Sequence, residues 1–123
     1  MSVILKSPSG ADVQINWWHW RPTMLLVRDA LQLDDRRFEM LQINGVGAQI
    51  SASEADRLAA FLDDYLVRFP KDGRLLPDGS VTREPKGSPD FSDGDGNRHY
   101  SADHDWLVQF RDFCRSSSGF TVL

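Results

Sequence analysis

The chain has 123 residues, of which 41% are hydrophobic and 26% are charged, with nine glycines and six prolines. This length and composition are typical of one globular domain and exclude a disordered, collagen-like or disulfide-rich protein. The single cysteine, Cys114, excludes an internal disulfide bond. The formal net charge of −4 argues against binding to the nucleic-acid backbone, which requires clustered lysine and arginine.

Further features bear on where the protein works. The N-terminal residues lack a basic stretch followed by an apolar run, which is the pattern of a secretion signal. No run of about 18 apolar residues is present to span a membrane. We therefore expect a cytoplasmic protein that binds neither membrane nor nucleic acid. Its core should be large enough to fold without a cofactor or a metal.

The first elements in chain order are predicted to be a β-hairpin and a helix. Residues 3–17 alternate apolar and polar side chains around the turn-forming residues 7–10, which indicates two antiparallel strands. Pro22 suits a first helical position and disfavours helix in the residue before it, so a helix is expected from Pro22 to Leu33. Its spacing places three apolar side chains on a buried face and three polar ones off it: Met24, Val27 and Leu31 against Arg28, Asp29 and Gln32.

Two more helices are expected in the middle of the chain. Residues 34–41 carry Phe38 and Leu41 at helical spacing, and Asn44, Gly45 and Gly47 interrupt that segment. Residues 51–54 match a capping box, so a helix should begin at Ala52 and stop before Pro70. Its apolar face is predicted to consist of Ala55, Leu58, Ala59, Leu62 and Leu66.

The C-terminal part is predicted to contain a hairpin, a loop, a helix and a strand. Residues 74–76 and 80–82 flank a turn sequence, and residues 84–97 have the Pro and Gly content of a long surface loop. Ser101 is expected to cap a helix with an apolar stripe of Trp106, Leu107, Phe110, Phe113 and Cys114, followed by a closing strand at 120–123. The prediction is one α+β domain over residues 1–123, with a small, mostly antiparallel sheet and three to four helices.

Negative charge is concentrated in residues 90–105. This segment holds five aspartates and one arginine, a charge of −4 that equals the charge of the whole chain: Asp90, Asp93, Asp95, Asp103 and Asp105 with Arg98. Such a patch favours a basic protein partner. Residues 93–97 are similar to the start of a calcium-binding loop, but Arg98 occupies the position of its glycine and His104 that of its bidentate glutamate. A solvated acidic loop is the simpler interpretation.

The same segment leaves a second function open. His99, His104, Asp103 and Asp105 carry ligand types that suit a transition metal, although their spacing is not diagnostic. A small-molecule or metal-assisted enzyme with its site in residues 84–105 is therefore the alternative. A Cys–His nucleophile pair is excluded, because His104 and Cys114 would lie about 15 Å apart on one helix. We expect Cys114 to be a small buried side chain. Residues 44–47 lack the third glycine and the lysine of a phosphate loop.

Three of the four tryptophans lie within residues 17–20. On a strand, Trp18 and Trp20 would share one face and Trp17 and His19 the other, so one side could pack in the core and the other could meet a partner. Tryptophan and arginine are enriched at binding hot spots, which makes Trp18 with Arg21 a candidate contact. Core packing is the other interpretation of the cluster.

Several short motifs resemble those of a group of short uncharacterised bacterial proteins. They are residues 18–22 (WHWRP), Asn44–Gly45 before the Ser51 cap, residues 100–102, and residues 113–115 leading into 118–120. The resemblance implies a bacterial cytoplasmic protein and brings no catalytic residue or cofactor. In size and charge the chain is also similar to immunity proteins, which neutralise toxins. The leading prediction is a protein-binding domain, with contact candidates Trp18, Trp20, Arg21, Asp93, Asp95, His99 and Asp103.

Overall fold

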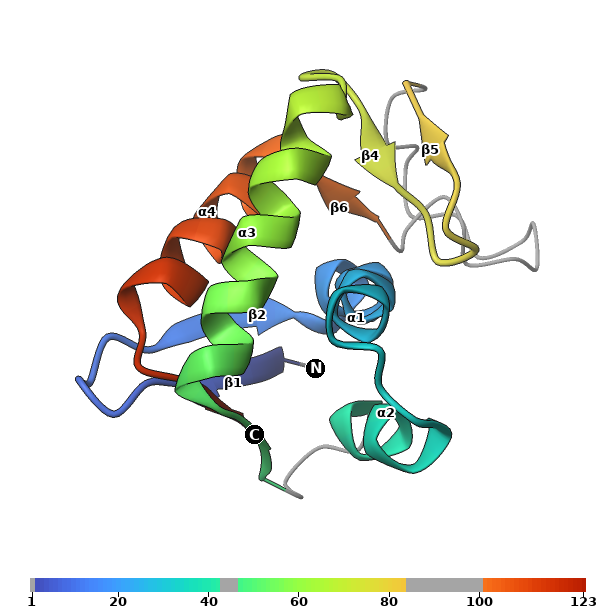
Figure 1. Cartoon of the computed structure of the whole chain (residues 1–123). Helices are drawn as coiled ribbons and strands as arrows, with labels where there is room; N and C mark the ends of the chain where they lie inside the picture. Colours follow the sequence, from blue (N-terminus) through green and yellow to red (C-terminus); the bar gives the residue numbers. More distant parts are fainter. Residues whose placement is uncertain (1, 43–46, 84–100) are drawn as a thin grey trace.

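The computed structural model describes residues 2–42, 47–83 and 101–123, which form an α+β fold (Figure 1). One antiparallel sheet has the strand order β2-β1-β7-β3 and consists of β1 (Ser2–Lys6), β2 (Val13–Asn16), β7 (Phe120–Val122) and β3 (Ala48–Ile50). A smaller antiparallel sheet has the order β5-β4-β6 and consists of β5 (Val81–Thr82), β4 (Arg74–Leu75) and β6 (Ala102–Asp103). The helices are α1 (Trp17–Leu31), α2 (Asp35–Gln42), α3 (Ala52–Arg68) and α4 (His104–Ser116).

The predicted α+β class, both hairpins and the closing strand are confirmed. The second hairpin does not join the first sheet, because β4 pairs instead with the short strand β6, which the sequence did not predict. The loop expected at residues 84–97 lies outside the described residues. Among the residues that are described, no helix has the length and apolarity required to cross a membrane.

Helix α1 begins five residues earlier than predicted, so the strand interpretation of the tryptophan cluster is wrong. Asn16 is the N-cap, and its side-chain oxygen accepts a hydrogen bond of 2.8 Å from the Trp18 N–H. Pro22 therefore lies inside the helix, where its missing N–H costs one helical hydrogen bond. Burial of Trp20 offsets that cost: its side chain is fully buried and its ring meets Phe110 edge-on at 5.8 Å.

Helix α3 follows the sequence prediction residue for residue at its start. The Ser51 hydroxyl accepts from the Glu54 N–H, and the Glu54 carboxylate accepts from the Ser51 N–H, which completes the capping box. The predicted apolar face of α3 is buried in full. At the same end, Arg37 of α2 makes a two-bonded ion pair with the Glu54 carboxylate, with N–O distances of 2.5 and 2.6 Å.

Helix α4 is capped by Asp103 and not by the predicted Ser101. The Asp103 carboxylate accepts a hydrogen bond of 2.8 Å from the Trp106 N–H, and Asp105 lies in the first turn. Ser101 is buried before β6, where it cannot serve as a cap. The predicted apolar stripe of α4 is buried as expected.

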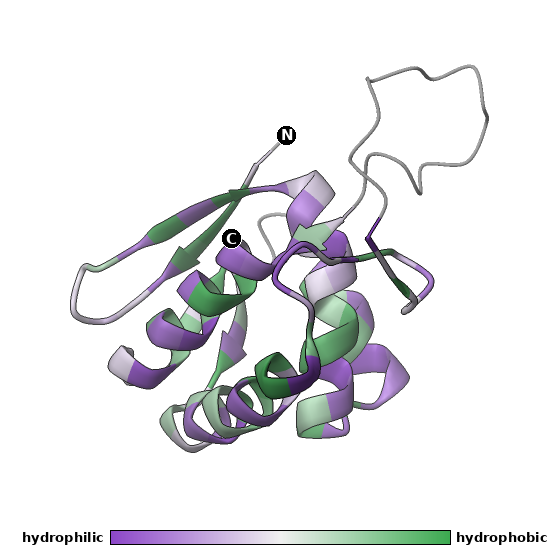
Figure 2. Ribbon diagram, turned by 90° about the horizontal axis from the view of Figure 1, so that it is seen from above, coloured by the Kyte–Doolittle hydropathy of each residue, from purple (hydrophilic) through white to green (hydrophobic). Residues whose placement is uncertain are grey.

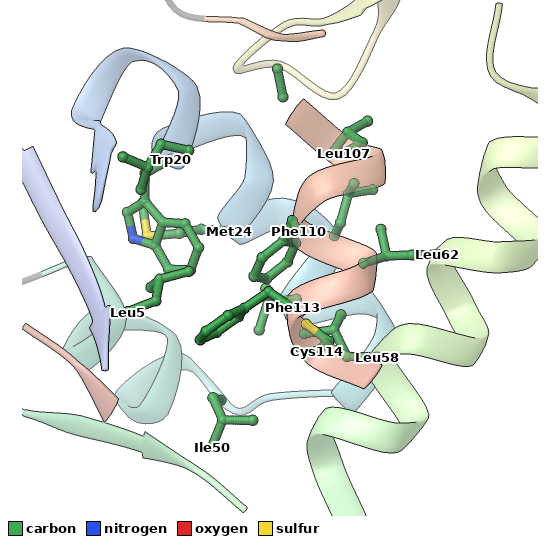
Figure 3. Close-up of a cluster of buried hydrophobic side chains, with 14 of the residues drawn as sticks. Leu5, Trp20, Met24, Ile50, Leu58, Leu62, Leu107, Phe110, Phe113 and Cys114 are labelled. Atoms are coloured by element: carbon green, nitrogen blue, oxygen red, sulfur yellow. The ribbon is translucent and has the colours of Figure 1, made fainter. Parts of the chain in front are cut away.

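The core lies between the four-stranded sheet and helices α1, α3 and α4. Figure 3 shows Trp20 and Met24 from α1 beside Phe110 and Phe113 from α4, with Leu58 and Leu62 of α3 on the other side of α4. Along the helices, hydrophobic and hydrophilic residues alternate (Figure 2), as expected where one face of each helix is buried. This packing brings the start of α1 next to the start of α4.

Candidate protein-interaction site

Two predicted contact regions, the tryptophan cluster and the described part of the acidic segment, are neighbours in the fold. Helix α1 contacts β6. The connection includes a hydrogen bond of 2.7 Å from the His19 Nδ1–H to the Ser101 carbonyl, across 82 positions of sequence. Because a carbonyl can only accept, Nδ1 carries the proton. The α1–β6 surface is defined here as Trp18, His19, Arg21, Asp103, His104 and Asp105.

Buried hydrogen bonds hold the start of α1 against the start of α4. The Thr23 hydroxyl donates to the His19 carbonyl at 2.6 Å, and the Trp106 Nε1–H donates to the Thr23 oxygen at 2.8 Å. Thr23 is fully buried, so its hydroxyl would be costly to leave unpaired. The network therefore holds the first turns of α1 in one position relative to α4.

The exposed part of the α1–β6 surface combines aromatic, basic and acidic side chains. Trp18 is half-buried and Arg21 is exposed, both on the first turns of α1. Asp103 and Asp105 are exposed at the start of α4, and the side chain of Asp105 is fully exposed, with its Oδ1 3.9 Å from His104 Nδ1. His104 is half-buried because its ring stacks on Phe69 with centroids 6.1 Å apart.

One contact candidate from the sequence must be corrected. Trp20 has 0% of its surface exposed, so it belongs to the core and offers a partner nothing to touch. On a helix, residues 18 and 20 point in directions about 200° apart, whereas on the predicted strand they would have shared a face. Asp93, Asp95 and His99 lie outside the described residues.

The thiol and metal chemistry considered from the sequence finds little support among the described residues. Cys114 is fully buried, and burial raises the pKa of its thiol well above the usual value, which suits a core side chain and not a nucleophile. Within the described ranges, no group of three His, Cys, Asp or Glu residues could hold a metal ion. His99, one of the four suggested ligands, lies outside those ranges.

The described hollows of the molecule lie elsewhere. A hollow of about 540 Å³ is lined by the ends of β1, β3 and β7 and by the start of α3. Another of about 400 Å³ is lined by Tyr65, Arg68, Phe69, Pro70 and Val81. Neither of these two hollows includes a member of the α1–β6 surface.

Sequence reasoning missed the residues that assemble this surface. Thr23, Ser101 and the indole N–H of Trp106 each read as an ordinary helix or cap residue, and their hydrogen bonds join positions more than 80 residues apart. Only the four-residue spacing of His19 and Thr23, which permits the hydroxyl to bond one turn back, was visible in the sequence.

No protein-family model, curated protein sequence or solved structure matches the chain.

Proposed function

We propose that this chain is a small protein-binding domain that contacts a basic protein through the α1–β6 surface. The observation that carries the proposal is that α1, which bears the half-buried Trp18 and the exposed Arg21, contacts β6, which ends at the exposed Asp103 directly before α4. Tryptophan and arginine are the residue types most enriched at interface hot spots. Carboxylates at the rim attract a basic partner and increase the rate of association.

A finer version of the proposal is a toxin-neutralising, immunity-type role in a bacterial cytoplasm. It is supported by small size, a net charge of −4 and the similarity in size and charge described above. In this version the basic partner is a toxic protein, and the α1–β6 surface covers part of it. Co-expression of this chain should then relieve the growth defect that the captured partner causes.

The test is affinity capture from a bacterial lysate with the immobilised chain at low and at high salt. We expect basic proteins to be retained at low salt and released at high salt, because screening weakens contacts between exposed charges. The Asp105→Asn variant should retain less, since Asp105 is fully exposed and is not the cap. The matched control is Asp56→Asn, which removes an exposed carboxylate from α3 instead.

Equal capture by both variants would contradict the assignment of the surface, and no capture at either salt would contradict the function. A rise in melting temperature on adding zinc or calcium, without any captured protein, would instead favour the metal-assisted enzyme, because a ligand that binds only the folded state stabilises it.

A further inference from the structure

The direction of the backbone groups in the four-stranded sheet can be worked out from one pair of hydrogen bonds. The Ile4 N–H donates to the Leu123 carbonyl at 3.2 Å, and the Leu123 N–H donates to the Ile4 carbonyl at 2.8 Å. Ile4 therefore directs its backbone groups toward β7. Because neighbouring residues of an antiparallel strand point to opposite sides, Val3 and Leu5 direct theirs toward β2.

The register between β1 and β2 then shows which groups of β2 face outward. Val3 lies opposite Ile15 and Leu5 opposite Val13, so Ile15 and Val13 bond to β1. By the same alternation, the N–H and C=O of Gln14 and the N–H of Asn16 point away from β1. Among the described strands, none pairs with β2 on that side.

The opposite edge of the sheet, strand β3, is covered by other parts of the chain. Gln49 is the central residue of β3, and the same alternation directs its backbone groups outward. There, Nη2 of Arg37 donates to the Gln49 carbonyl at 3.1 Å, and α2 contacts β3. This edge is therefore covered by a helix and by a cation, two common devices against strand pairing. Strand β2 contains neither a charged residue nor a proline.

The ends of the β2 edge limit what can pair with it. The Asp12 N–H is already bonded to the Gly10 carbonyl at 3.0 Å. Asn16 is the N-cap of α1, so its carbonyl accepts the first bond of that helix. The outward groups available for pairing are thus confined to a few residues around Gln14. A long foreign strand would run past these ends and leave its own groups unpaired.

We infer that the outer edge of β2 pairs with β2 of a second copy of this chain, antiparallel and centred on Gln14, so that two four-stranded sheets become one. In this register the two Gln14 residues exchange both backbone bonds, and each Asn16 N–H faces residue 12 of the other copy. The pairing leaves the Asp12 N–H and the Asn16 carbonyl without partners on the other copy. Both groups are already bonded within their own chain.

Charge does not oppose this arrangement. The charged residue nearest to β2 along the chain is the exposed Asp12, which in this register lies opposite Asn16 of the second copy and not opposite the other Asp12. The two Asp12 residues are four positions apart along the paired strands, or about 14 Å, which exceeds the screening length of about 8 Å at physiological salt. Residues 8–12 are exposed, and a Cβ built on Gly10 meets nothing within 4 Å, so the turn leaves space for the second copy.

A four-residue edge buries much less than the roughly 1,200 Å² of a stable interface, so the dimer is weak and depends on concentration. We expect a dissociation constant of about 0.1–1 mM. Sedimentation of the full chain between about 10 μM and 1 mM should show a rising average mass. The decisive variant is Gln14→Pro, which removes the outward N–H that pairing needs and spares every backbone hydrogen bond to β1.

The matched control is Gln14→Thr, which keeps the N–H and loses the same side-chain bond, the 3.0 Å contact from Gln14 Nε2 to Ser2 Oγ. We expect Gln14→Pro to weaken dimerisation at least about tenfold and Gln14→Thr to change it by about twofold or less. A wild-type chain that remains monomeric at about 1 mM would overturn the proposal, as would a Gln14→Pro variant that dimerises like the control.

A second measurement decides the matter if Gln14→Pro does not fold. Hydrogen exchange of the wild-type chain is followed at both concentrations by NMR. The Gln14 amide should exchange more slowly at high concentration, while the amide of Gln49, at the edge covered by α2, should exchange at an unchanged rate. A Gln14 exchange rate that does not depend on concentration would contradict pairing at this edge.

Discussion

Replacing Leu62 with alanine tests the packing between α3 and α4. Leu62 is fully buried and projects from α3 toward α4 (Figure 3). Ion pairs from Asp63 to Arg111 and Arg115 also join the two helices, which limits how far they can move to fill a cavity. Leucine-to-alanine changes in cores cost about 2–5 kcal/mol, and poor relaxation places the cost in the upper part of that range. We expect Leu62→Ala to lower the free energy of unfolding by about 3–4 kcal/mol.

Urea denaturation monitored by tryptophan fluorescence measures this loss. With a denaturant slope of about 2 kcal/mol per molar, the midpoint should fall by roughly 1.5–2 M. Val67→Ala is the matched control, because Val67 lies on the same helix with 83% of its surface exposed and should change stability by no more than about 0.5 kcal/mol. If the two variants unfold at the same urea concentration, the assignment of the buried face of α3 is wrong.

Four further substitutions probe polar contacts of the core and the helix ends. Ser51→Ala should lower the unfolding free energy by about 1 kcal/mol through loss of the cap, and an unchanged urea midpoint would contradict a role for the capping box. The hydrogen bond from Arg37 is the main reason that the pKa of Glu54 falls from 4.5 to about 2. The ionised Glu54 carboxylate therefore stabilises the folded protein above about pH 4.5, and this contribution is lost as the pH falls toward 2. Urea titrations at pH 6 and pH 2.5 measure how much unfolding free energy each protein loses on acidification. The parent should lose about 1–2 kcal/mol more than Glu54→Gln, a value reduced for solvent screening at the partly exposed Arg37. Equal losses would refute the pairing. Among the described residues, the buried Trp20 Nε1–H has no hydrogen-bond partner, whereas the Trp106 Nε1–H donates to Thr23. Trp106→Phe should therefore lower the unfolding free energy by about 1–2 kcal/mol more than Trp20→Phe does. The reverse order in urea denaturation would show that the Trp20 N–H has a partner.

Local sequence signals were sufficient wherever the stabilising partners lie within a few residues. The start of α3 depends on Ser51 and Glu54, which are three positions apart, so the capping box could be read directly. The apolar faces of α3 and α4 follow from helical periodicity, because a repeat near 3.6 residues determines which side chains share a face. The hairpins follow from turn residues between alternating segments.

The candidate site was predicted only in part. Arg21 and Asp103 were identified from the sequence and are exposed in the structure, and Trp18 retains part of its surface. Trp20 was assigned to the same surface because the cluster was interpreted as a strand, and the structure buries it. That the start of α1 and the start of α4 adjoin follows from the bonds of His19 and Trp106 to distant residues, for which the sequence carries no local signal.

The sequence by itself thus determined the class of fold, the capped helix α3 and the periodic faces of the helices, since each depends on neighbours along the chain. Only the tertiary structure decided that α1 begins at Trp17, with Pro22 inside it, and that Asp103 and not Ser101 caps α4. Local preference disfavours a proline inside a helix by about 3 kcal/mol. Burial of the Trp20 ring against Phe110 offsets that preference, and this contact joins residues that are 90 positions apart.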